Sequence, residues 1–242
     1  GDIACPSLHS DRLALALGAL HFSDPTGLAQ RCFDDVRRCV ESVQHSGTAR
    51  LTVTRGSGPR GYAPPESGSP RHILTLFPLL EMTPSAQICG IAHTRWAHQP
   101  QLAGLKLLAR TEQVLAAQEA AAQHWDDALM LDTQGHVIST TRGNIFAFFG
   151  SQCVTPDLSQ CGIAGTRRQL LIDSVLPELN YTVEEQSMTL AKLREADTVL
   201  ISNTVRGVVA ISRIEDQHYP DSTLTERVQA ALIQQVAAWV AG

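Results

Sequence analysis

The stretch Leu102-Ala-Gly-Leu-Lys-Leu-Leu-Ala109 sets a single lysine, Lys106, among apolar neighbours. The chain has 19 basic residues, yet Lys106 and Lys192 are its only lysines. Burial disfavours the charged form of an amine, which lowers its pKa and leaves a neutral nucleophile toward carbonyl groups. Lys192 lies in a polar-faced helical stretch where a solvated lysine is ordinary, so Lys106 is the candidate catalytic residue. The local sequence also allows a second interpretation, in which Lys106 extends from an apolar helix to water.

A candidate anion site lies further along the chain. Cys161-Gly-Ile-Ala-Gly165 leads into Thr166-Arg-Arg-Gln-Leu-Leu171, a glycine turn that opens a predicted helix. The N–H groups and the positive dipole end at the start of a helix favour a phosphate. Ser202-Asn-Thr204 ends a predicted strand and could add hydroxyl and amide donors. Taken singly both features are weak, because many helices follow a glycine and many strands end in such a turn.

Composition excludes several classes of function. The 242 residues, 43% of them hydrophobic, suffice for one large domain or two small ones. A formal net charge of -5 gives no basic field for nucleic acid. No apolar run is long enough for a membrane span, and the N-terminus shows no signal pattern. Six scattered cysteines without a C-x-x-C pair indicate neither a zinc site nor a disulfide framework, so we expect a cytoplasmic protein with reduced thiols and no bound metal.

The pattern of apolar residues and turns predicts an α+β chain of two domains. We expect a smaller N-terminal domain over 1–97, with helices at 9–21 and 25–44 and strands at 49–54, 73–77 and 87–94. We expect a linker at 97–101 and a larger domain over 98–242. Its predicted elements are a helix at 107–122, strands at 128–131, 137–139 and 144–149, a helix at 165–179, strands at 182–185, 198–202 and 208–211, and a helix at 223–240. This order lacks a regular βαβ rhythm, which argues against a Rossmann-type sheet.

Several motifs, in a consistent order, resemble the pyridoxal-phosphate (PLP) enzymes of fold type IV, which include the D-amino-acid and branched-chain aminotransferases. His9-Ser-Asp-Arg12-Leu13 resembles an element whose arginine contacts the cofactor phosphate. Thr54-Arg-Gly-Ser-Gly-Pro-Arg-Gly-Tyr-Ala-Pro-Pro65 resembles a loop that carries an arginine into the partner subunit's site. Leu102 to Leu115 is similar to the lysine segment, and Ala128 to Phe146 to the hairpin under the pyridine ring. Gly162 to Arg168 and Ser202 to Thr204 fall where the family has its phosphate cup.

The resemblance implies a cofactor, a site and an assembly. The cofactor is PLP, Lys106 is the catalytic residue that holds it, and the protein is a homodimer that acts on a small molecule. Substrate binding falls to Arg60 and Tyr62. The implied cofactor-binding residues are Arg12, Lys106, Ser139, Asn144, Gly165, Thr166, Arg167, Asn203 and Thr204.

Within the family, the loop at 54–65 and the run at 102–115 most resemble the aminodeoxychorismate lyases. The implied reaction converts 4-amino-4-deoxychorismate to 4-aminobenzoate and pyruvate, a step in folate biosynthesis. The alternatives are a class IV aminotransferase, of the D-amino-acid or branched-chain type, and a catalytically weakened relative.

Three departures from the family pattern keep the alternatives open. Ser139 stands where the family has a glutamate facing the pyridine nitrogen, and Ala109 where the lyases often have Asn. The family also begins with a strand and a glycine-rich turn, so we expect that this N-terminal segment is missing here. If the hairpin were shifted, another acid such as Glu112 could serve the ring.

Overall fold

The computed structural model describes residues 3–65, 68–79, 85–220 and 223–241, and the chain divides into two compact units, Gly1–Met82 and Thr83–Gly242. The first unit contains helices α1 (Pro6–Ala19) and α2 (Pro25–Ser42) and the antiparallel strands β1 (Gly47–Thr54) and β2 (Arg71–Pro78). Asp24 caps α2 by accepting a hydrogen bond from the N–H of Gly27 at 3.1 Å. Apolar side chains of both helices form a small core, and Leu51 and Val53 of β1 pack against it.

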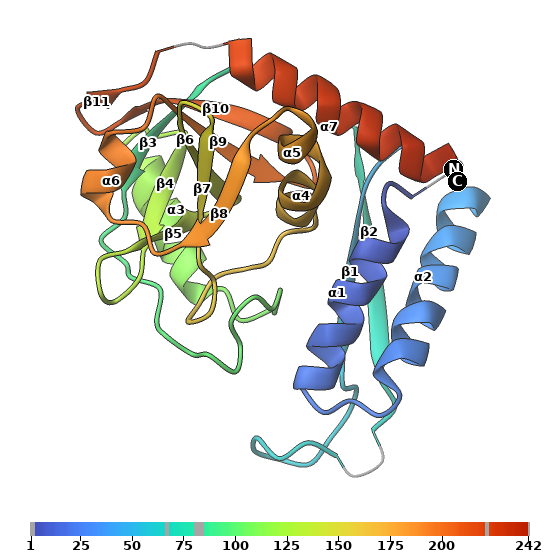
Figure 1. Cartoon of the computed structure of the whole chain (residues 1–242). Helices are drawn as coiled ribbons and strands as arrows, with labels where there is room; N and C mark the ends of the chain where they lie inside the picture. Colours follow the sequence, from blue (N-terminus) through green and yellow to red (C-terminus); the bar gives the residue numbers. More distant parts are fainter. Residues whose placement is uncertain (1–2, 66–67, 80–84, 221–222, 242) are drawn as a thin grey trace. The chain divides into compact units, whose positions relative to one another are not determined.

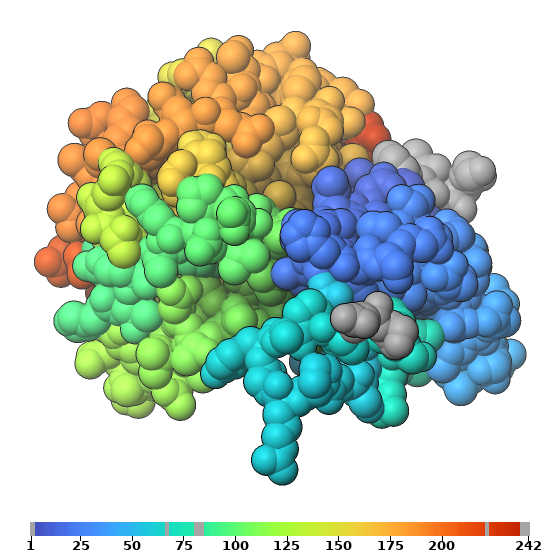
Figure 2. Space-filling model, turned by 90° about the horizontal axis from the view of Figure 1, so that it is seen from below, coloured from blue at the N-terminus to red at the C-terminus, as the bar shows by residue number. Residues whose placement is uncertain are grey.

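The loop between β1 and β2 carries little core of its own. Gly56 and Gly61 have positive φ angles, 82° and 93°, which few other residues adopt. Arg55 anchors the start of the loop, because its guanidinium lies 4.3 Å from the ring centre of Phe22. Part of this segment, cyan in Figure 2, projects from the surface, and Tyr62 is fully exposed.

The second unit is built on a nine-stranded mixed sheet with helices on it. In the order β11-β10-β3-β4-β5-β6-β7-β8 neighbouring strands are hydrogen-bonded, and β9 pairs with both β10 and β6 (Figure 1). Its elements are β3 (Gln87–Ile91), α3 (Thr111–Ala122), β4 (Asp127–Leu131), β5 (Val137–Thr140), β6 (Asn144–Phe149), β7 (Gln152–Pro156), α4 (Thr166–Leu170), η1 (Leu171–Val175), α5 (Leu176–Glu178), β8 (Thr182–Gln186), α6 (Leu190–Arg194), β9 (Thr198–Asn203), β10 (Gly207–Ile214), β11 (Gln217–His218) and α7 (Thr223–Ala241).

The double pairing of β9 closes six strands, β3, β4, β5, β6, β9 and β10, into a small barrel. One face of these strands forms a continuous apolar core, to which every strand of the barrel contributes, for example Leu129, Ile145 and Ile201. Alternate residues such as Ala128 and Met130 point outward and pack against α3. The barrel is therefore filled by side chains, and chemistry is left to its outer surface and ends.

The fold class expected from the sequence, α+β of fold type IV, is confirmed, with differences in detail. The strand at 87–94 was expected in the smaller domain, but β3 lies between β10 and β4 in the large sheet, with parallel partners on both sides. A mostly buried strand such as Gln-Ile-Cys-Gly-Ile suits a central parallel position. The division of the chain consequently precedes β3, earlier than the expected boundary between residues 97 and 98. Strand β7 was not expected.

Among the described residues, no helix is long and apolar enough to cross a membrane.

Candidate active site

A row of three polar residues runs across adjacent strands on the outer face of the barrel. In the antiparallel ladders Ser139 of β5 is opposite Asn144 of β6, and Asn144 is opposite Ser202 of β9. Directly opposed residues point to the same face of a sheet. The neighbours Ile145 and Ile201 face the barrel core, so the three polar side chains face outward. The site therefore begins as a polar strip on an otherwise apolar surface. We call these three residues, Ser139, Asn144 and Ser202, the Ser139–Ser202 strip.

Two hydroxyl groups of this strip are buried without a partner. Ser139 is 5% exposed and Ser202 is 1% exposed. Within the part of the chain that the structure describes, neither Oγ atom makes a hydrogen bond. An unsatisfied buried hydroxyl costs about 1–3 kcal/mol, so such groups usually await a ligand or water. Ser202 was not among the site residues predicted singly, although the stretch Ser202-Asn-Thr204 was expected to add hydroxyl and amide donors.

Asn144 fixes the segment that enters α4. Its Nδ2 donates to the carbonyl of Ile163 at 2.8 Å. A Cβ atom on Gly165 would lie 2.3 Å from Asn144 Oδ1, so only glycine permits this close approach. Asn144 and Gly165, both predicted to bind the cofactor, are thus in contact with each other. Their arrangement places the start of α4 directly beside the Ser139–Ser202 strip.

The lysine segment is attached to the same place. Gly104 donates its N–H to the carbonyl of Gly162 at 3.0 Å, and its own carbonyl accepts from the N–H of Ala164 at 2.9 Å. This isolated bridge pairs Gly104 with Ile163. Lys106 follows Gly104 by two residues, and Gly165 follows Ile163 by two residues. The structure therefore brings together the lysine segment and the predicted anion site, which lie about sixty residues apart in the sequence.

Lys106 lies in an irregular segment before α3 and is exposed. The expectation of a buried amine is therefore wrong for the described chain, as is the alternative of an apolar helix, because α3 begins only at Thr111. The physical reason is that the leucines of this segment do not enclose the lysine: Leu102 and Leu108 are themselves exposed.

Arg110 orders the lysine segment. Its Nη2 donates to the carbonyl of Leu105 at 2.6 Å and its Nε to the carbonyl of Leu107 at 3.1 Å. The guanidinium also lies 5.7 Å from the ring centre of Trp96, and burial lowers the pKa of Arg110. Arg110 lies within the Leu102–Leu115 run that resembles the family's lysine segment, but the sequence analysis assigned it no role. A signal was available, since an arginine close to a glycine-containing irregular segment can cap its carbonyl groups.

The start of α4 meets the turn between β9 and β10. The hydroxyl oxygens of Thr166 and Thr204 lie 3.2 Å apart. Arg167 is buried, and Arg168 is buried beside it with its Nη2 2.6 Å from Glu185. The sequence predicted a phosphate site at Thr166, Arg167 and Thr204. Thr166 and Arg167 are consecutive residues, and the Thr166–Thr204 contact brings Thr204 beside them.

Asn203 has a different environment from the one expected. Its Oδ1 accepts hydrogen bonds from the N–H groups of Val205 at 3.0 Å and Arg206 at 2.8 Å. It also lines a small cavity at the end of the barrel. Its side-chain oxygen therefore shapes the turn, and a direct contact with a cofactor stays a prediction.

Three predicted site residues belong to the first unit. Arg12 lies on α1 with its Nη2 3.5 Å from His9 Nδ1, and burial lowers its pKa. Arg60 and Tyr62 are exposed in the loop between β1 and β2. Their predicted roles toward phosphate and substrate remain predictions.

A groove of about 330 Å³ adjoins the lysine segment. It is lined by Trp96, Leu107, Ala109 and Arg110, but not by Lys106 or the Ser139–Ser202 strip. Glu112 also lines it and accepts a hydrogen bond from the N–H of Ala97 at 3.0 Å. That contact gives Glu112 a local structural role.

Comparison with known proteins identifies the family of this chain. Residues 1–214 match the model of the family described as amino-transferase class IV. The chain belongs to this family.

Within the family, the chain is similar to lyases. It is 34% identical over 234 residues to an aminodeoxychorismate lyase from Vibrio harveyi, covering 93% of this chain and 84% of that protein. The crystal structure of 4-amino-4-deoxychorismate lyase from Pseudomonas aeruginosa is 31% identical, with a TM-score of 0.86 and coverage of 96% and 85%. A branched-chain aminotransferase from Thermoproteus uzoniensis shares the fold, with a TM-score of 0.84, 20% identity and coverage of 98% and 81%.

Proposed function

We propose that this protein is a PLP-dependent lyase that converts 4-amino-4-deoxychorismate to 4-aminobenzoate and pyruvate. The observation that carries the proposal is the Gly104–Ile163 bridge, which brings the only lysine of an apolar stretch to the start of α4. The 34% identity to a lyase over most of both chains supports this choice of reaction.

The residues present fit the cofactor. PLP has polar atoms on its ring and a phosphate at one end, and the site offers partners for both. The hydroxyls of Ser139 and Ser202 are buried and unpartnered among the described residues, so they are available to hydrogen-bond polar atoms of the ring. Thr166 and Thr204 supply two adjacent hydroxyls, and Arg167 a guanidinium, for the phosphate. We assign Lys106 to the aldehyde end and, from the family resemblance of His9-Ser-Asp-Arg12-Leu13, Arg12 to the phosphate.

When bound, PLP supplies an aldehyde that condenses with amines and a ring that withdraws electrons from the attached carbon. The residues of the chain then need to remove one proton from the substrate. Lys106 takes the proton from the amino-bearing ring carbon of the substrate. The carbon–oxygen bond to the enolpyruvyl group breaks, the methylene of that group gains one proton in exchange for the one taken by Lys106, and pyruvate leaves. The substrate ring becomes aromatic, which makes the elimination strongly favourable.

The loop between β1 and β2 is assigned to the substrate. The substrate has two carboxylates, and an arginine presents a planar pair of donors that suits a carboxylate. Arg60 is exposed on the glycine- and proline-rich loop between β1 and β2. We propose a homodimer in which Arg60 and Tyr62 enter the partner's site, in a cytoplasmic enzyme of folate biosynthesis.

The rival function is a class IV aminotransferase, because branched-chain aminotransferases share the fold. Ser139 favours the lyase. A glutamate at the ring nitrogen would keep it protonated, whereas a hydroxyl supplies no charge. Aminotransfer depends more on the electron withdrawal of the ring than does an elimination assisted by aromatisation.

The deciding experiment measures both products together. Purified protein is incubated with PLP and 4-amino-4-deoxychorismate, and 4-aminobenzoate and pyruvate are quantified. The proposal requires equal amounts of both products without an added keto acid. Lys106→Ala should abolish the reaction, while Lys192→Ala is the matched control, since Lys192 is on α6 beside Phe149. Product formation only with a keto acid acceptor indicates an aminotransferase, and no reaction of a PLP-loaded protein indicates a weakened relative.

A further inference from the structure

The turn between β9 and β10 has a defined internal structure. Asn203 and Gly207 are paired at its base, and Asn203 Oδ1 accepts from two N–H groups inside the turn. Thr204, at the exposed side of the turn, meets Thr166 at the start of α4. The next residue but one, Arg206, turns toward the end of the barrel, where it lines the small cavity together with Gln87.

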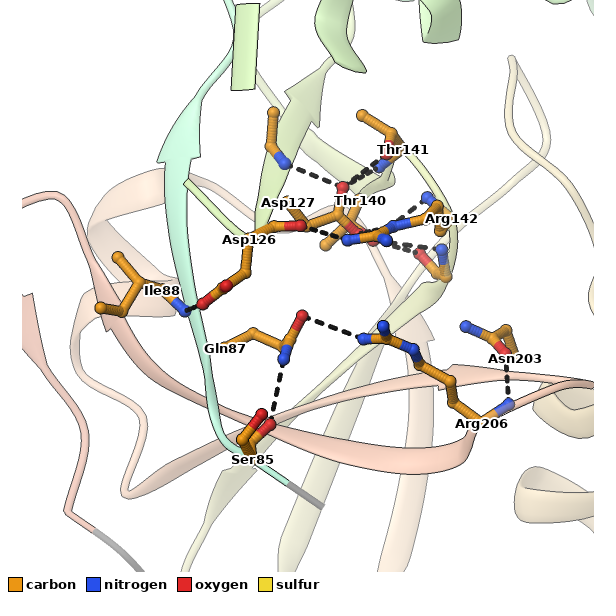
Figure 3. A network of polar contacts seen from close by, with 12 residues as sticks. Ser85, Gln87, Ile88, Asp126, Asp127, Thr140, Thr141, Arg142, Asn203 and Arg206 are labelled. Atoms are coloured by element: carbon orange, nitrogen blue, oxygen red, sulfur yellow. Dashed lines mark hydrogen bonds and ion pairs between the residues drawn. The ribbon is translucent and has the colours of Figure 1, made fainter. Parts of the chain in front are cut away.

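Arg206 is held by a residue distant in sequence. Its Nη1 donates to Gln87 Oε1 at 3.1 Å, across a separation of 119 residues (Figure 3). Gln87, at the start of β3, is 6% exposed. Its Nε2 donates to the carbonyl of Ser85 at 3.0 Å, and separately the backbone carbonyl of Gln87 accepts from Ser212 Oγ at 3.2 Å. Every polar group of this glutamine side chain is therefore used, which fixes the position of Oε1.

The turn is also held from α7. Gln229 Oε1 accepts the N–H of Val208 at 2.7 Å, directly after the turn. Gln87 of β3 holds the side chain of Arg206 and Gln229 of α7 holds the backbone of Val208, so the turn is restrained from two elements. Such restraint matters for a binding turn, because donors that are ordered before the ligand arrives lose less entropy on binding.

We propose that Arg206 and Gln87 are positioning residues for the phosphate group of the ligand, acting through the turn that carries Thr204. The inference rests on the proposed PLP site, because Thr204 is assigned to the phosphate there. Arg206 is not assigned to the phosphate itself, because its guanidinium donates to Gln87 Oε1. Loss of the Arg206–Gln87 hydrogen bond should loosen the phosphate end of the site and leave the lysine end unchanged.

The test separates these two ends of the ligand. Equilibrium dialysis of the full chain, freed of cofactor, measures the affinities for PLP and for pyridoxal, which has the same aldehyde but no phosphate. We expect Arg206→Met and Gln87→Leu each to weaken PLP binding about five- to tenfold, in line with one lost hydrogen bond. Pyridoxal affinity should not change. The double variant should be no weaker than either single variant, because both remove the same contact.

Arg194→Met is the matched control, since it also removes one guanidinium, from an exposed pair with Glu215. It should leave both affinities unchanged, and Arg206→Lys should restore part of the PLP affinity. Equal losses for PLP and pyridoxal, or additive losses in the double variant, would overturn the inference. So would variants with wild-type PLP affinity. If Arg206→Met does not fold, Gln87→Leu tests the same contact. Wild-type protein that does not bind PLP at all would instead refute the proposed function.

Discussion

Arg110 holds the peptide groups on both sides of Lys106, through donor–acceptor distances of 2.6 Å to Leu105 and 3.1 Å to Leu107. Lys106 lies in an irregular segment, whose backbone would otherwise sample many conformations. The backbone that carries it is instead fixed by Arg110 after it and by the Gly104–Ile163 bridge before it. Order at this lysine thus comes from its backbone and not from burial of its side chain.

Replacing Arg110 should therefore disturb both stability and the lysine. Arg110→Met removes two hydrogen bonds from a charged donor, so we expect a loss of about 1–3 kcal/mol in the free energy of unfolding. The rate at which Lys106 takes up PLP should also fall. Urea unfolding and stopped-flow absorbance measure the two effects. Arg37→Met on the exposed side of α2 is the control, and unchanged uptake by Arg110→Met would contradict the ordering role.

Lys106 should be the residue that carries PLP. Borohydride reduction of the PLP-loaded protein followed by peptide mapping should place the pyridoxyl group on Lys106. Lys192 is the internal control, because it is the only other lysine of the chain. A label on Lys192, or no label after reconstitution, contradicts the assignment.

Arg60→Ala should impair substrate binding without affecting the cofactor. We expect KM for 4-amino-4-deoxychorismate to rise about tenfold or more, because a charge-assisted contact to a carboxylate is lost. The affinity for PLP should stay the same. Arg38→Ala, an exposed arginine of α2 paired with Asp35, is the control. Full activity in a species that is monomeric by light scattering would refute the proposed exchange of loops between subunits.

Ser139 offers a test of the ring environment. Ser139→Ala removes an unpartnered buried hydroxyl, so the cofactor-free protein should keep its stability or gain about 1 kcal/mol. Ser139→Glu should shift the absorption spectrum of the PLP-loaded protein and raise transamination relative to pyruvate release. Thermal unfolding checks that the larger side chain is tolerated. An unchanged spectrum and product ratio for Ser139→Glu would mean that residue 139 does not face the ring nitrogen.

Acid should destabilise the protein partly through Asp132. Burial acts to raise the pKa of Asp132, but hydrogen bonds with His98 and His136 and from the N–H of Gln134 outweigh it and hold this pKa below its ordinary value. Because folding lowers the pKa, the stabilisation is present above the ordinary carboxyl range and is lost as pH falls through the folded value, below roughly pH 4.

Urea unfolding from neutral to acid pH measures this contribution. Asp132→Asn should be less stable at neutral pH by about 1–3 kcal/mol and should lose less on acidification than the wild type. Asp216→Asn, an exposed carboxylate after β10, is the control. Parallel stability curves for the wild type and Asp132→Asn would show that Asp132 does not contribute.

The sequence predicted most elements, because their apolar periodicity and turn residues are local. It also predicted that Lys106 and the Gly165–Thr166 turn act together, through the order of the motifs. It did not predict the neighbours of β3, since a buried strand can take any partner until the whole sheet is known. Nor could it find the Arg206–Gln87 contact, which joins residues 119 apart, or the unpartnered hydroxyl of Ser202. The exposure of Lys106 was missed because apolar neighbours in sequence need not be neighbours in space.

The pairing of β3 with β10 also governs when the enzyme can form during its synthesis. The ribosome completes β3 early, whereas β10 follows more than a hundred residues later, on the order of ten seconds at usual elongation rates. Until then β3 and β6 lack their β10 and β9 partners, and open strand edges invite association with other chains. The first unit, made of sequence-local contacts, can fold at once. We therefore expect nascent chains stalled before β9 to be the species that chaperones capture, and the site to appear only after translation of Ile214.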